Sequence, residues 1–503
     1  MTAQFYLDKF SFWARDHKIT ISASKSQALL IGAKRPLKRN PSIKLYGNPI
    51  KIVKQLKYLG LIIDSRLSWL PYLQYLKIKT DSLKNYMQRT AAPTWGISSK
   101  LLKHWYLTVT QAIVLYGSGI WAKHLTVQER RLLNSLQRPH LLQISRGYRT
   151  TSTAALQVLT GIPPLDLVAE REAAISNILR LGKDYKLWNR NLHTSEYMHK
   201  IFDYPCHPAQ HNLAENIYTQ TLLLCRQNSI AIYTDGSKTK DGTGCGLCTM
   251  IDGEIKYRWK RRLNPNNTVY QAELSAIKKA IDLSYSHQET VYIYSDSLSS
   301  IAAIEGPASR DPFVLNIQRA LVNLPLNYRP IISWVPAHTG VVGNELADEQ
   351  AKQAASGIFL PEHALPLPSS YLKKITRGDL YAEWQQRWDT SQTGRRTYKF
   401  IPKVTDLVFS NSSSLTTFLS GHGPFPDYLH RFGLRDYDLC ECGLIGTPDH
   451  YAFTCRLTEA HHMRPPSDRY WREWTKVLLE RRGACFKLHK IIKFCRVHFS
   501  FVT

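Results

Sequence analysis

The sequence predicts an α/β fold, in which a mixed sheet packs against helices in the middle of the chain. Two observations predict it. Between residues 229 and 356, runs rich in β-branched and aromatic residues alternate with segments of helical periodicity. In chain order they indicate three strands joined by tight turns, then helix, strand, helix, strand and helix. This order is typical of a mixed five-stranded sheet with helices packed on it.

Each element of this unit has its own signal. Gly and Asp mark the turns between the first three strands, and Asn344 is placed to cap the last helix. The expected strands are SIAIYT (229–234), DGTGCGLCTM (241–250), EIKYRWKRR (254–262), VYIYS (291–295) and IISWVP (331–336). The expected helices are VYQAELSAIKKAIDLSY (269–285), SLSSIAAIEG (297–306) and NELADEQAKQAA (344–355).

The composition indicates a folded protein with a polyanionic partner. A chain of 503 residues needs several domains, and 66 Lys and Arg against 39 Asp and Glu leave a net charge of +27, which suits nucleic acid. The nine cysteines are irregularly spaced, unlike a secreted disulfide framework. The amino terminus lacks the apolar core of a signal peptide, and no apolar run is long enough to span a bilayer. We expect a soluble intracellular protein of the nucleus or cytoplasm, without membrane contact.

Changes in composition divide the chain into five segments. Residues 1–175 are short β segments followed by helices, 229–356 is the alternating unit, and 371–503 is helical and basic. The segments between them, 176–228 and 357–370, are predicted as linkers. The first is rich in His, Asn, Pro and Gln, and the second contains FLPEHALPLPSS with its three prolines.

Four acids of the middle unit are expected at strand ends and inner helix turns. Asp235 ends the first strand, and Asp296 follows VYIYS in the same way. Glu273 shares a helical stripe with two isoleucines, so its carboxylate turns toward the sheet. Asp348 lies near the start of the last helix. A carboxylate in such a place is costly unless it is paired or bound to a metal.

These acids predict a divalent-cation site. Four neighbouring carboxylates cannot all be ionised without a cation, and ligands of oxygen alone suit Mg²⁺ or Mn²⁺ better than zinc. Two such ions about 3.5 to 4 Å apart can hold a scissile phosphate and activate water for in-line attack. Turn formation is the alternative role for Asp235 taken alone.

The motifs TDGS, QAEL, YSDS and WVPAHTGVVGNELAD, in this order, resemble the type 1 ribonuclease H family across residues 229–356. The resemblance implies a ribonuclease H-like fold and places the family's four metal-binding carboxylates on Asp235, Glu273, Asp296 and Asp348. It also places the family's loop histidine, which assists proton transfer or product release, on His338. A lone loop histidine would otherwise be expected only to be solvated.

The positive charge is unevenly distributed. Between residues 229 and 356, 13 Lys and Arg balance 13 Asp and Glu, so the excess of +27 lies in the flanks. Five of the bases crowd into KYRWKRR with two aromatic residues between them, and such a cluster could bind a nucleic-acid backbone and stack on sugars or bases. A charged edge strand is the alternative. The candidate nucleic-acid-binding residues are Lys256, Arg258, Lys260, Arg261 and Arg262.

Three amino-terminal motifs resemble the tail of a reverse transcriptase of the jockey-like, non-LTR retrotransposon type. They are FSFWARDHKITISASKSQALLIG (10–32), LKYLGLIID (56–64) and VLYGSGIW (114–121). YRTTSTAALQVLTGIPPLDL (148–167) resembles the segment that bridges to ribonuclease H in arthropod elements of this kind.

This second resemblance implies that residues 1–175 are the end of a palm, a thumb and a connecting helical region. It places Lys25 where the family keeps a lysine near the incoming nucleotide. The paired aspartates that bind polymerase metals do not occur anywhere in the chain. We therefore expect a truncated element without polymerase activity.

A cysteine–histidine cluster near the carboxyl terminus is a candidate zinc site. Cys440, Cys442, His450 and Cys455 have the spacing C-x-C-x₇-H-x₄-C, and three thiolates with an imidazole can close a tetrahedral structural zinc site. By contrast, Cys245 and Cys248 are three residues apart on a strand and point to opposite faces, so we expect them to be packing residues.

Together these observations predict an endonuclease that cuts the RNA strand of RNA–DNA hybrids with two Mg²⁺ or Mn²⁺ ions, within a retrotransposon-derived protein. A catalytically silent nucleic-acid-binding remnant is the alternative. A transposase or integrase has a similar core with acids in the order Asp, Asp, Glu. Glu273 comes second here and Asp348 last, which argues against that class. No oligomeric state is predicted.

Overall fold

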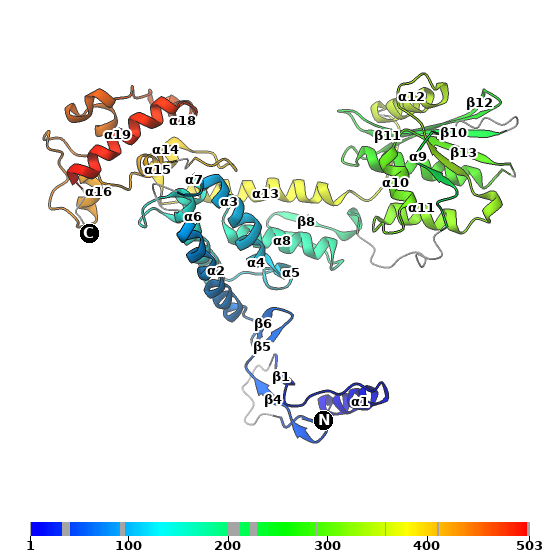
Figure 1. Ribbon diagram of the computed structural model, residues 1–503, viewed down its shortest axis with the longest axis horizontal. Helices are drawn as coiled ribbons and strands as arrows, with labels where there is room; N and C mark the ends of the chain where they lie inside the picture. Colours follow the sequence, from blue (N-terminus) through cyan, green and yellow to red (C-terminus); the bar gives the residue numbers. More distant parts are fainter. Residues whose placement is uncertain are drawn as a thin grey trace. The chain divides into compact units, whose positions relative to one another are not determined.

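The computed structural model of the chain describes residues 2–32, 41–90, 96–199, 212–221, 229–287, 289–357, 359–409 and 412–499 (Figure 1). It divides into two compact units, Met1–Ala173 with Gly378–Thr503 and Ala174–Arg377. In the described residues, every helix is too short or too polar to cross a membrane.

The unit Ala174–Arg377 contains a mixed sheet of seven strands, which confirms the predicted α/β class. The central pairs are antiparallel between β10, β11 and β12, and parallel between β10, β13 and β14. The strand order across the sheet is β15 (Glu362–His363), β12 (Glu254–Leu263), β11 (Thr243–Ile251), β10 (Ile230–Lys238), β13 (Val291–Ser295), β14 (Ile331–Trp334) and β9 (Ile217–Tyr218). A separate hairpin joins β7 (Tyr185–Leu187) to β8 (Arg190–Leu192).

The five predicted strands are all present, but the sheet has two more. The additional strands, β9 and β15, come from the segments that the sequence predicts as linkers, 176–228 and 357–370. Each is two residues long and pairs at one edge of the sheet. Two residues are too few to show a periodic pattern, so sequence reasoning had no signal for them. Parts of the first linker, 200–211 and 222–228, lie outside the described residues.

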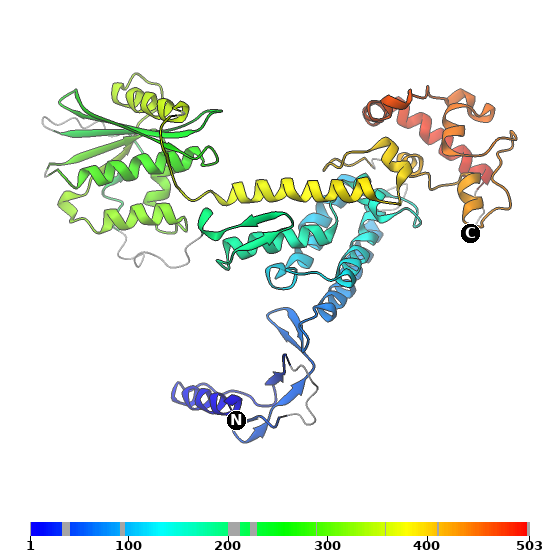
Figure 2. The ribbon, with the colours of Figure 1, turned by 180° about the vertical axis from the view of Figure 1, so that it is seen from behind.

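The helices of this unit form two layers, which Figure 2 shows from behind. One layer is α9 (Val269–Ser284), α10 (Leu298–Glu305) and α11 (Pro312–Val322), and the other is α12 (Val342–Ser356). The first layer packs its isoleucines and leucines on Ile230, Ile232 and Ile293 of the sheet. Helix α11 is absent from the elements predicted above, although Asp311 caps it and Pro312 occupies its first turn, which together are a usual start signal.

A row of glycines lets α12 approach the other face of the sheet. A Cβ at Gly244 would lie 2.3 Å from the Ala355 nitrogen and 2.6 Å from the Ala351 oxygen, and a Cβ at Gly246 would lie 2.5 Å from the Ala351 nitrogen. All of these are backbone atoms, which cannot move aside as a flexible side chain can. The helix therefore rests directly on β11, and this contact fixes the height of α12 above the sheet.

Two predicted details of this unit have clear outcomes. Cys245 and Cys248 are both fully buried, and Cys245 packs with Ala272 and Ala276 of α9, which confirms their packing role. The prediction that Asn344 caps the last helix was wrong. The helix begins two residues earlier, with Val341 as its N-cap, so Asn344 lies inside its first turn.

The other unit is mostly helical, as predicted for both flanks. Its first part has the helices α1 (Thr2–Asp16), α2 (Leu70–Thr90), α3 (Ser99–Trp105), α4 (Gln111–Leu115), α5 (Ser118–Trp121), α6 (Val127–Ser145), α7 (Thr153–Thr160) and α8 (Leu165–Leu179), with a π-helical turn at Tyr106–Thr110. Before α2 lie the short pairs β1 (Gln27–Leu29) with β4 (Lys51–Val53), β2 (Lys44–Leu45) with β3 (Asn48–Pro49), and β5 (Gln55–Tyr58) with β6 (Leu61–Asp64).

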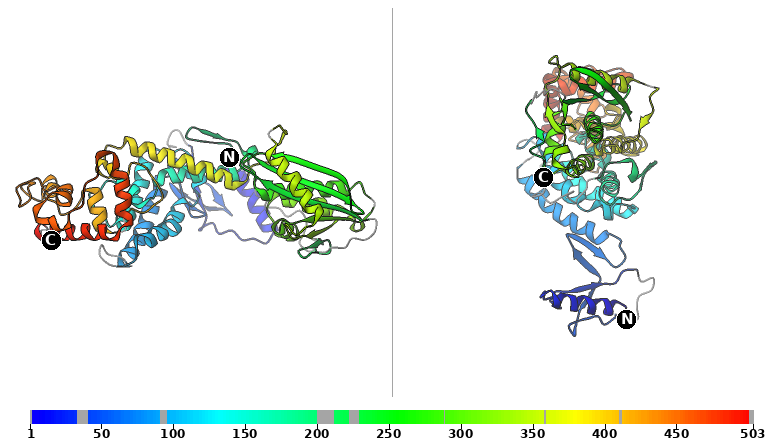
Figure 3. Two further views of the ribbon diagram at one scale, coloured as in Figure 1. Left: turned by 90° about the horizontal axis from the view of Figure 1, so that it is seen from above. Right: turned by 90° about the vertical axis from the view of Figure 1, so that its right-hand side faces the viewer.

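Its second part has the helices α13 (Ser369–Thr390), α14 (Arg395–Phe400), α15 (Ser413–Ser420), α16 (Pro426–Arg431), α17 (Pro448–Phe453), α18 (Trp471–Glu480) and α19 (Arg482–Phe499). Figure 3 shows α19 in red beside the orange segment against which it packs. Buried polar contacts join the two parts. The Asp166 carboxylate, fully buried in α8, accepts from Arg387 at 2.7 Å and from Arg130 at 3.3 Å. Because a buried carboxylate needs such partners, this pair of arginines ties α13 to α6 and α8.

We predict that Gly244→Ala destabilises the sheet unit. The added methyl group must displace the backbone of α12, and overpacking of this kind costs about 1 to 3 kcal/mol. For a unit of this size, that lowers the unfolding midpoint by roughly 2 to 4 °C for each kcal/mol. Scanning calorimetry of the full chain measures it. The control is Gly378→Ala in α13, where a Cβ meets no atom within 4 Å, and a midpoint for Gly244→Ala equal to that of the wild type would contradict the prediction.

Candidate functional site

Two of the predicted acids are neighbours because of the strand register. Strands β10 and β13 run parallel, with Thr234 opposite Ser295, so Asp235 and Asp296 follow side by side. Asp296 directly follows β13, as predicted. Asp235 does not end its strand, however, because β10 continues to Lys238 through pairing with β11. The glycine opposite Asp235 on β11 is one of those that receive α12.

Glu273 reaches the same place from helix α9. Gly236 allows α9 to pass this close to β10, because a Cβ at position 236 would lie only 2.5 Å from the Glu273 nitrogen. The helix starts at the capping box of Thr268 and Gln271, which fixes its first turn just before Glu273. As the helical stripe predicted, the Glu273 side chain is buried, and its Oε2 has no hydrogen-bond partner.

The oxygens of Asp235, Glu273 and Asp296 all lie within 4.8 Å of one another. Burial, together with the charge of Asp296, raises the pKa of Asp235 to about 7. Burial and the neighbouring Asp235 raise the pKa of Glu273 well above its usual range, and burial raises that of Asp296. A raised carboxyl pKa means that the folded chain disfavours the ionised form. Among the described residues, none of the three carboxylates forms an ion pair with a lysine or an arginine.

Asp348, the fourth predicted acid, borders this trio without completing it. It lies on α12, and its charge contributes to the raised pKa of both Asp235 and Asp296. Its Oδ2 accepts a hydrogen bond from the Lys352 ammonium at 2.6 Å. The glycine contact that sets the height of α12 also sets the position of Asp348 above β10.

His338 lies in the loop between β14 and α12. It is exposed and has a left-handed backbone with φ of 55°, an uncommon conformation for a residue with a side chain. A positive charge on its imidazole would offset part of the rise in the pKa of Asp296 that burial causes.

Two residues that the sequence analysis did not assign to the site hold Asp296. The Asn344 side chain donates to Asp296 Oδ2 at 3.4 Å, and the Trp334 indole nitrogen donates to the Asp296 carbonyl oxygen at 3.1 Å. Trp334 ends β14 and Asn344 lies in α12, and both belong to the motif that carries His338. The sequence indicates only a helix cap at Asn344 and gives no sign that its side chain contacts Asp296.

The predicted basic cluster does not form one patch. Regular alternation along β12 turns Arg258, Lys260 and Arg262 toward α12, where Lys260 donates to Gln353 at 2.7 Å. Arg261 points to the other face, with its guanidinium 5.1 Å from the Trp259 ring. Lys256 lies at a bulge and pairs with Glu254.

Arg262 is the only buried residue among the five predicted nucleic-acid-binding residues. Its side chain is buried, and one guanidinium nitrogen donates to the Asp241 carbonyl oxygen at 2.9 Å. The end of β12 lies under the Asp241 turn, so a group there stabilises the turn and is not offered to a ligand. Lys256, Arg258 and Lys260 are exposed, and Arg261 is half-buried.

The carboxylate trio fits a divalent cation. It offers only oxygen atoms, one of them buried without a partner, at separations that a single ion can bridge. Carboxylate ligands of this kind suit Mg²⁺ or Mn²⁺.

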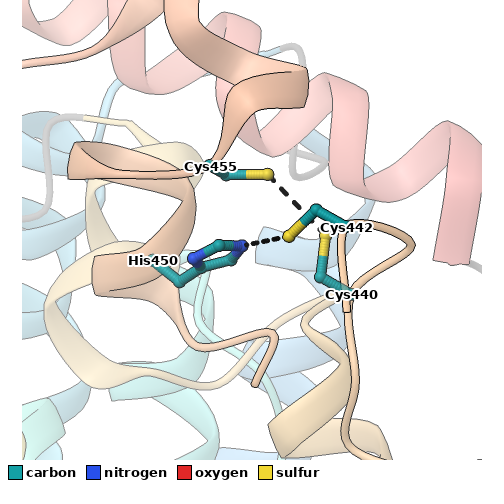
Figure 4. Close-up of side chains that lie close together, drawn as sticks. All are labelled: Cys440, Cys442, His450 and Cys455. Atoms are coloured by element: carbon teal, nitrogen blue, oxygen red, sulfur yellow. Dashed lines mark hydrogen bonds between the residues drawn. The ribbon is translucent and has the colours of Figure 1, made fainter. Parts of the chain in front are cut away.

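The four predicted zinc ligands also converge (Figure 4). Cys440 and Cys442 come from a tight turn at Gly443, and His450 and Cys455 come from α17 and the residues after it. Cys442 Sγ lies 3.1 Å from His450 Nε2, and Cys440 Sγ lies 3.7 Å from Cys455 Sγ. The other ring nitrogen of His450 is 3.1 Å from the Thr454 hydroxyl, a contact that orients the imidazole.

Comparison with known proteins identifies the class of the middle unit. Residues 227–356 match the ribonuclease H family (RNase H), so this part of the chain is a ribonuclease H domain. The match spans β10 to α12 and includes all four predicted carboxylates and His338.

Less than half of the chain is similar to Pol polyproteins of R1 retrotransposable elements of arthropods. The protein from Bradysia coprophila is 30% identical over 33% of this chain and 16% of its own length. The protein from Popillia japonica is 27% identical over 46% of this chain and 90% of its own length. The first of these is therefore matched over far less than two thirds of its length. A solved RNase H1 from Halobacterium salinarum is 21% identical over 26% of this chain and 98% of its own, with a TM-score of 0.22.

Proposed function

We propose that the chain hydrolyses the RNA strand of RNA–DNA hybrids with two divalent cations. The observation that carries this proposal is the trio of Asp235, Glu273 and Asp296, of which the first two are buried and the third is half-buried, with ligand oxygens within 4.8 Å of one another. A fold that holds three acids in this way is stabilised by divalent cations, and the trio belongs to a ribonuclease H domain.

Each residue of the site has a proposed role that follows from its position. Asp235, Glu273 and Asp296 would hold the cations, and Asp348 would complete the set from α12. When bound, two such ions polarise the scissile phosphate and lower the pKa of the attacking water. Asn344 and Trp334 fix the orientation of Asp296. His338, exposed on its loop, moves a proton or assists release of the product.

Binding of the hybrid would depend on both units. The unit Ala174–Arg377 has 22 Lys and Arg against 18 Asp and Glu, a net +4, so +23 of the total +27 lies in the other unit. Positive charge of this size suits the phosphate backbone, which contributes most of sequence-independent affinity. Selection of RNA over DNA would use the 2′-hydroxyl group. Polymerase activity is not proposed, since the chain has no pair of adjacent aspartates.

The main alternative is a nucleic-acid-binding protein without catalysis. The trio disfavours it, because neighbouring acids of which two are buried cost stability and would repel a phosphate group. We place the protein in a reducing intracellular compartment, the nucleus or cytoplasm. The cysteines within the described segments are all free thiols, which supports this placement.

Asp235→Asn and Asp296→Asn should each abolish cutting of the RNA strand. Loss of one ligand removes several kcal/mol of charge stabilisation, so activity should fall about a thousandfold or more. The measurement is cleavage by the full chain of hybrid, duplex RNA and duplex DNA, with Mg²⁺ or Mn²⁺ present.

The matched control for this assay is Asp241→Asn, which removes an exposed acid of the same domain and should keep full activity. Full activity of either site variant would refute the metal assignment. Equal cutting of duplex DNA would favour the transposase class, and no cutting by the wild type would favour the silent alternative.

We also propose that Cys440, Cys442, His450 and Cys455 hold a structural zinc ion. The four ligand atoms lie together on a small turn and a short helix, with Cys440 and Cys455 buried. Thiolates with one imidazole are the ligand set of closed zinc sites. The same segment packs on α19 through Tyr451 and Ile491, so the ion would stabilise the end of the chain.

Metal analysis tests this second proposal. The purified full chain should hold about one zinc ion, and the double variant Cys442→Ser, Cys455→Ser should hold none and unfold this region at a lower temperature. Cys485→Ser, a thiol outside the cluster, is the matched control and should keep its zinc. Equal zinc in all three proteins would show that these residues are not ligands.

A further inference from the structure

One carboxylate of the site, that of Asp348, already forms an ion pair with a lysine. The Lys352 ammonium lies 2.6 Å from Asp348 Oδ2, one helical turn further along α12. Among the described residues, no other lysine or arginine forms an ion pair with any of the four site acids. The Lys352 charge also acts on Asp235, so it reaches into the site itself.

This pair explains why Asp348 lies outside the trio. Asp235, Glu273 and Asp296 repel one another and have raised pKa values, whereas Asp348 is drawn to its own helix by Lys352. A divalent cation bound at Asp348 would repel the nearby ammonium and compete with it for the negative charge of the same carboxylate. Binding of a cation at Asp348 is therefore opposed by Lys352.

We propose that Lys352 is a positioning residue that holds Asp348 in the cation-free chain and competes with the divalent cation bound there. The proposal rests on the two-cation function above and describes how that site is regulated. Lys352 thereby raises the cation concentration at which the fourth acid joins the other three.

The structure allows the exchange without movement of the fold. The backbone of α12 is fixed against β11 by the glycine contacts, so neither residue can withdraw with its helix. The Lys352 side chain is 58% exposed, and that of Asp348 is 22% exposed. Lysine can therefore rotate into solvent while Asp348 stays beside Asp235.

Titration of Mn²⁺ onto the full chain by calorimetry, without substrate, tests the proposal. Lys352→Gln should bind Mn²⁺ about two- to fivefold more tightly than the wild type, the range that an exposed ion pair supports. Lys352→Arg keeps the pair and should bind as the wild type does. The matched control is Lys278→Gln, which breaks an i,i+4 pair with Asp282 on α9 and should leave the affinity unchanged.

Each outcome has a distinct meaning. Wild-type binding of Mn²⁺ with unchanged or weaker affinity in Lys352→Gln would overturn this proposal and leave the proposed function standing. A gain in affinity equal to that of Lys278→Gln would show only an effect of net charge and would also overturn it. No saturable binding by any of the proteins would overturn both proposals together.

Discussion

The close contact between α12 and β11 is the constraint on which the rest of the site depends. Backbone atoms of Ala351 and Ala355 occupy the space that a Cβ would need at Gly244 and Gly246, so the helix cannot rise or slide without losing this contact. Asp348 and its partner Lys352 project from the same helix. Gly236 acts similarly on the opposite face, where it admits the backbone of α9 at Glu273. Backbone packing on both faces thus brings acids to the carboxyl-terminal ends of the central strands β10 and β13.

The backbone packing of α9 and α12 holds carboxylates together against their mutual electrostatic repulsion. Burial and mutual repulsion raise the pKa of Asp235, Glu273 and Asp296, so the cation-free site is a source of instability that the rest of the domain must offset. A divalent cation would relieve that repulsion, and the Lys352 ammonium already lies 2.6 Å from the Asp348 carboxylate. In this account, the affinity of the site for a divalent cation comes from the repulsion among carboxylates that the glycine contacts hold close together.

Prediction from sequence succeeded where one residue carried one strong local signal. Glu273 lies on its predicted helical stripe and Asp296 directly follows its strand, whereas β10 continues past Asp235 to Lys238. The structure brings the oxygens of all three together. Prediction failed where the signal was tertiary. The two-residue strands β9 and β15 exist only through pairing with a neighbour, and Arg262 is buried because a turn folds over it. Nothing in the spacing of KYRWKRR shows which bases share a face with α12.

The stability of the full chain with and without Mg²⁺ tests most directly whether the fold holds like charges together for a cation. The account predicts that Asp235→Asn is more stable than the wild type without added divalent cation, and that Mg²⁺ stabilises the wild type more than the variant. At a free Mg²⁺ concentration 100 times its dissociation constant, the bound ion adds about 2.7 kcal/mol to the free energy of unfolding of the wild type. If the two proteins had equal stability without Mg²⁺, and Mg²⁺ left both unchanged, the account would be contradicted.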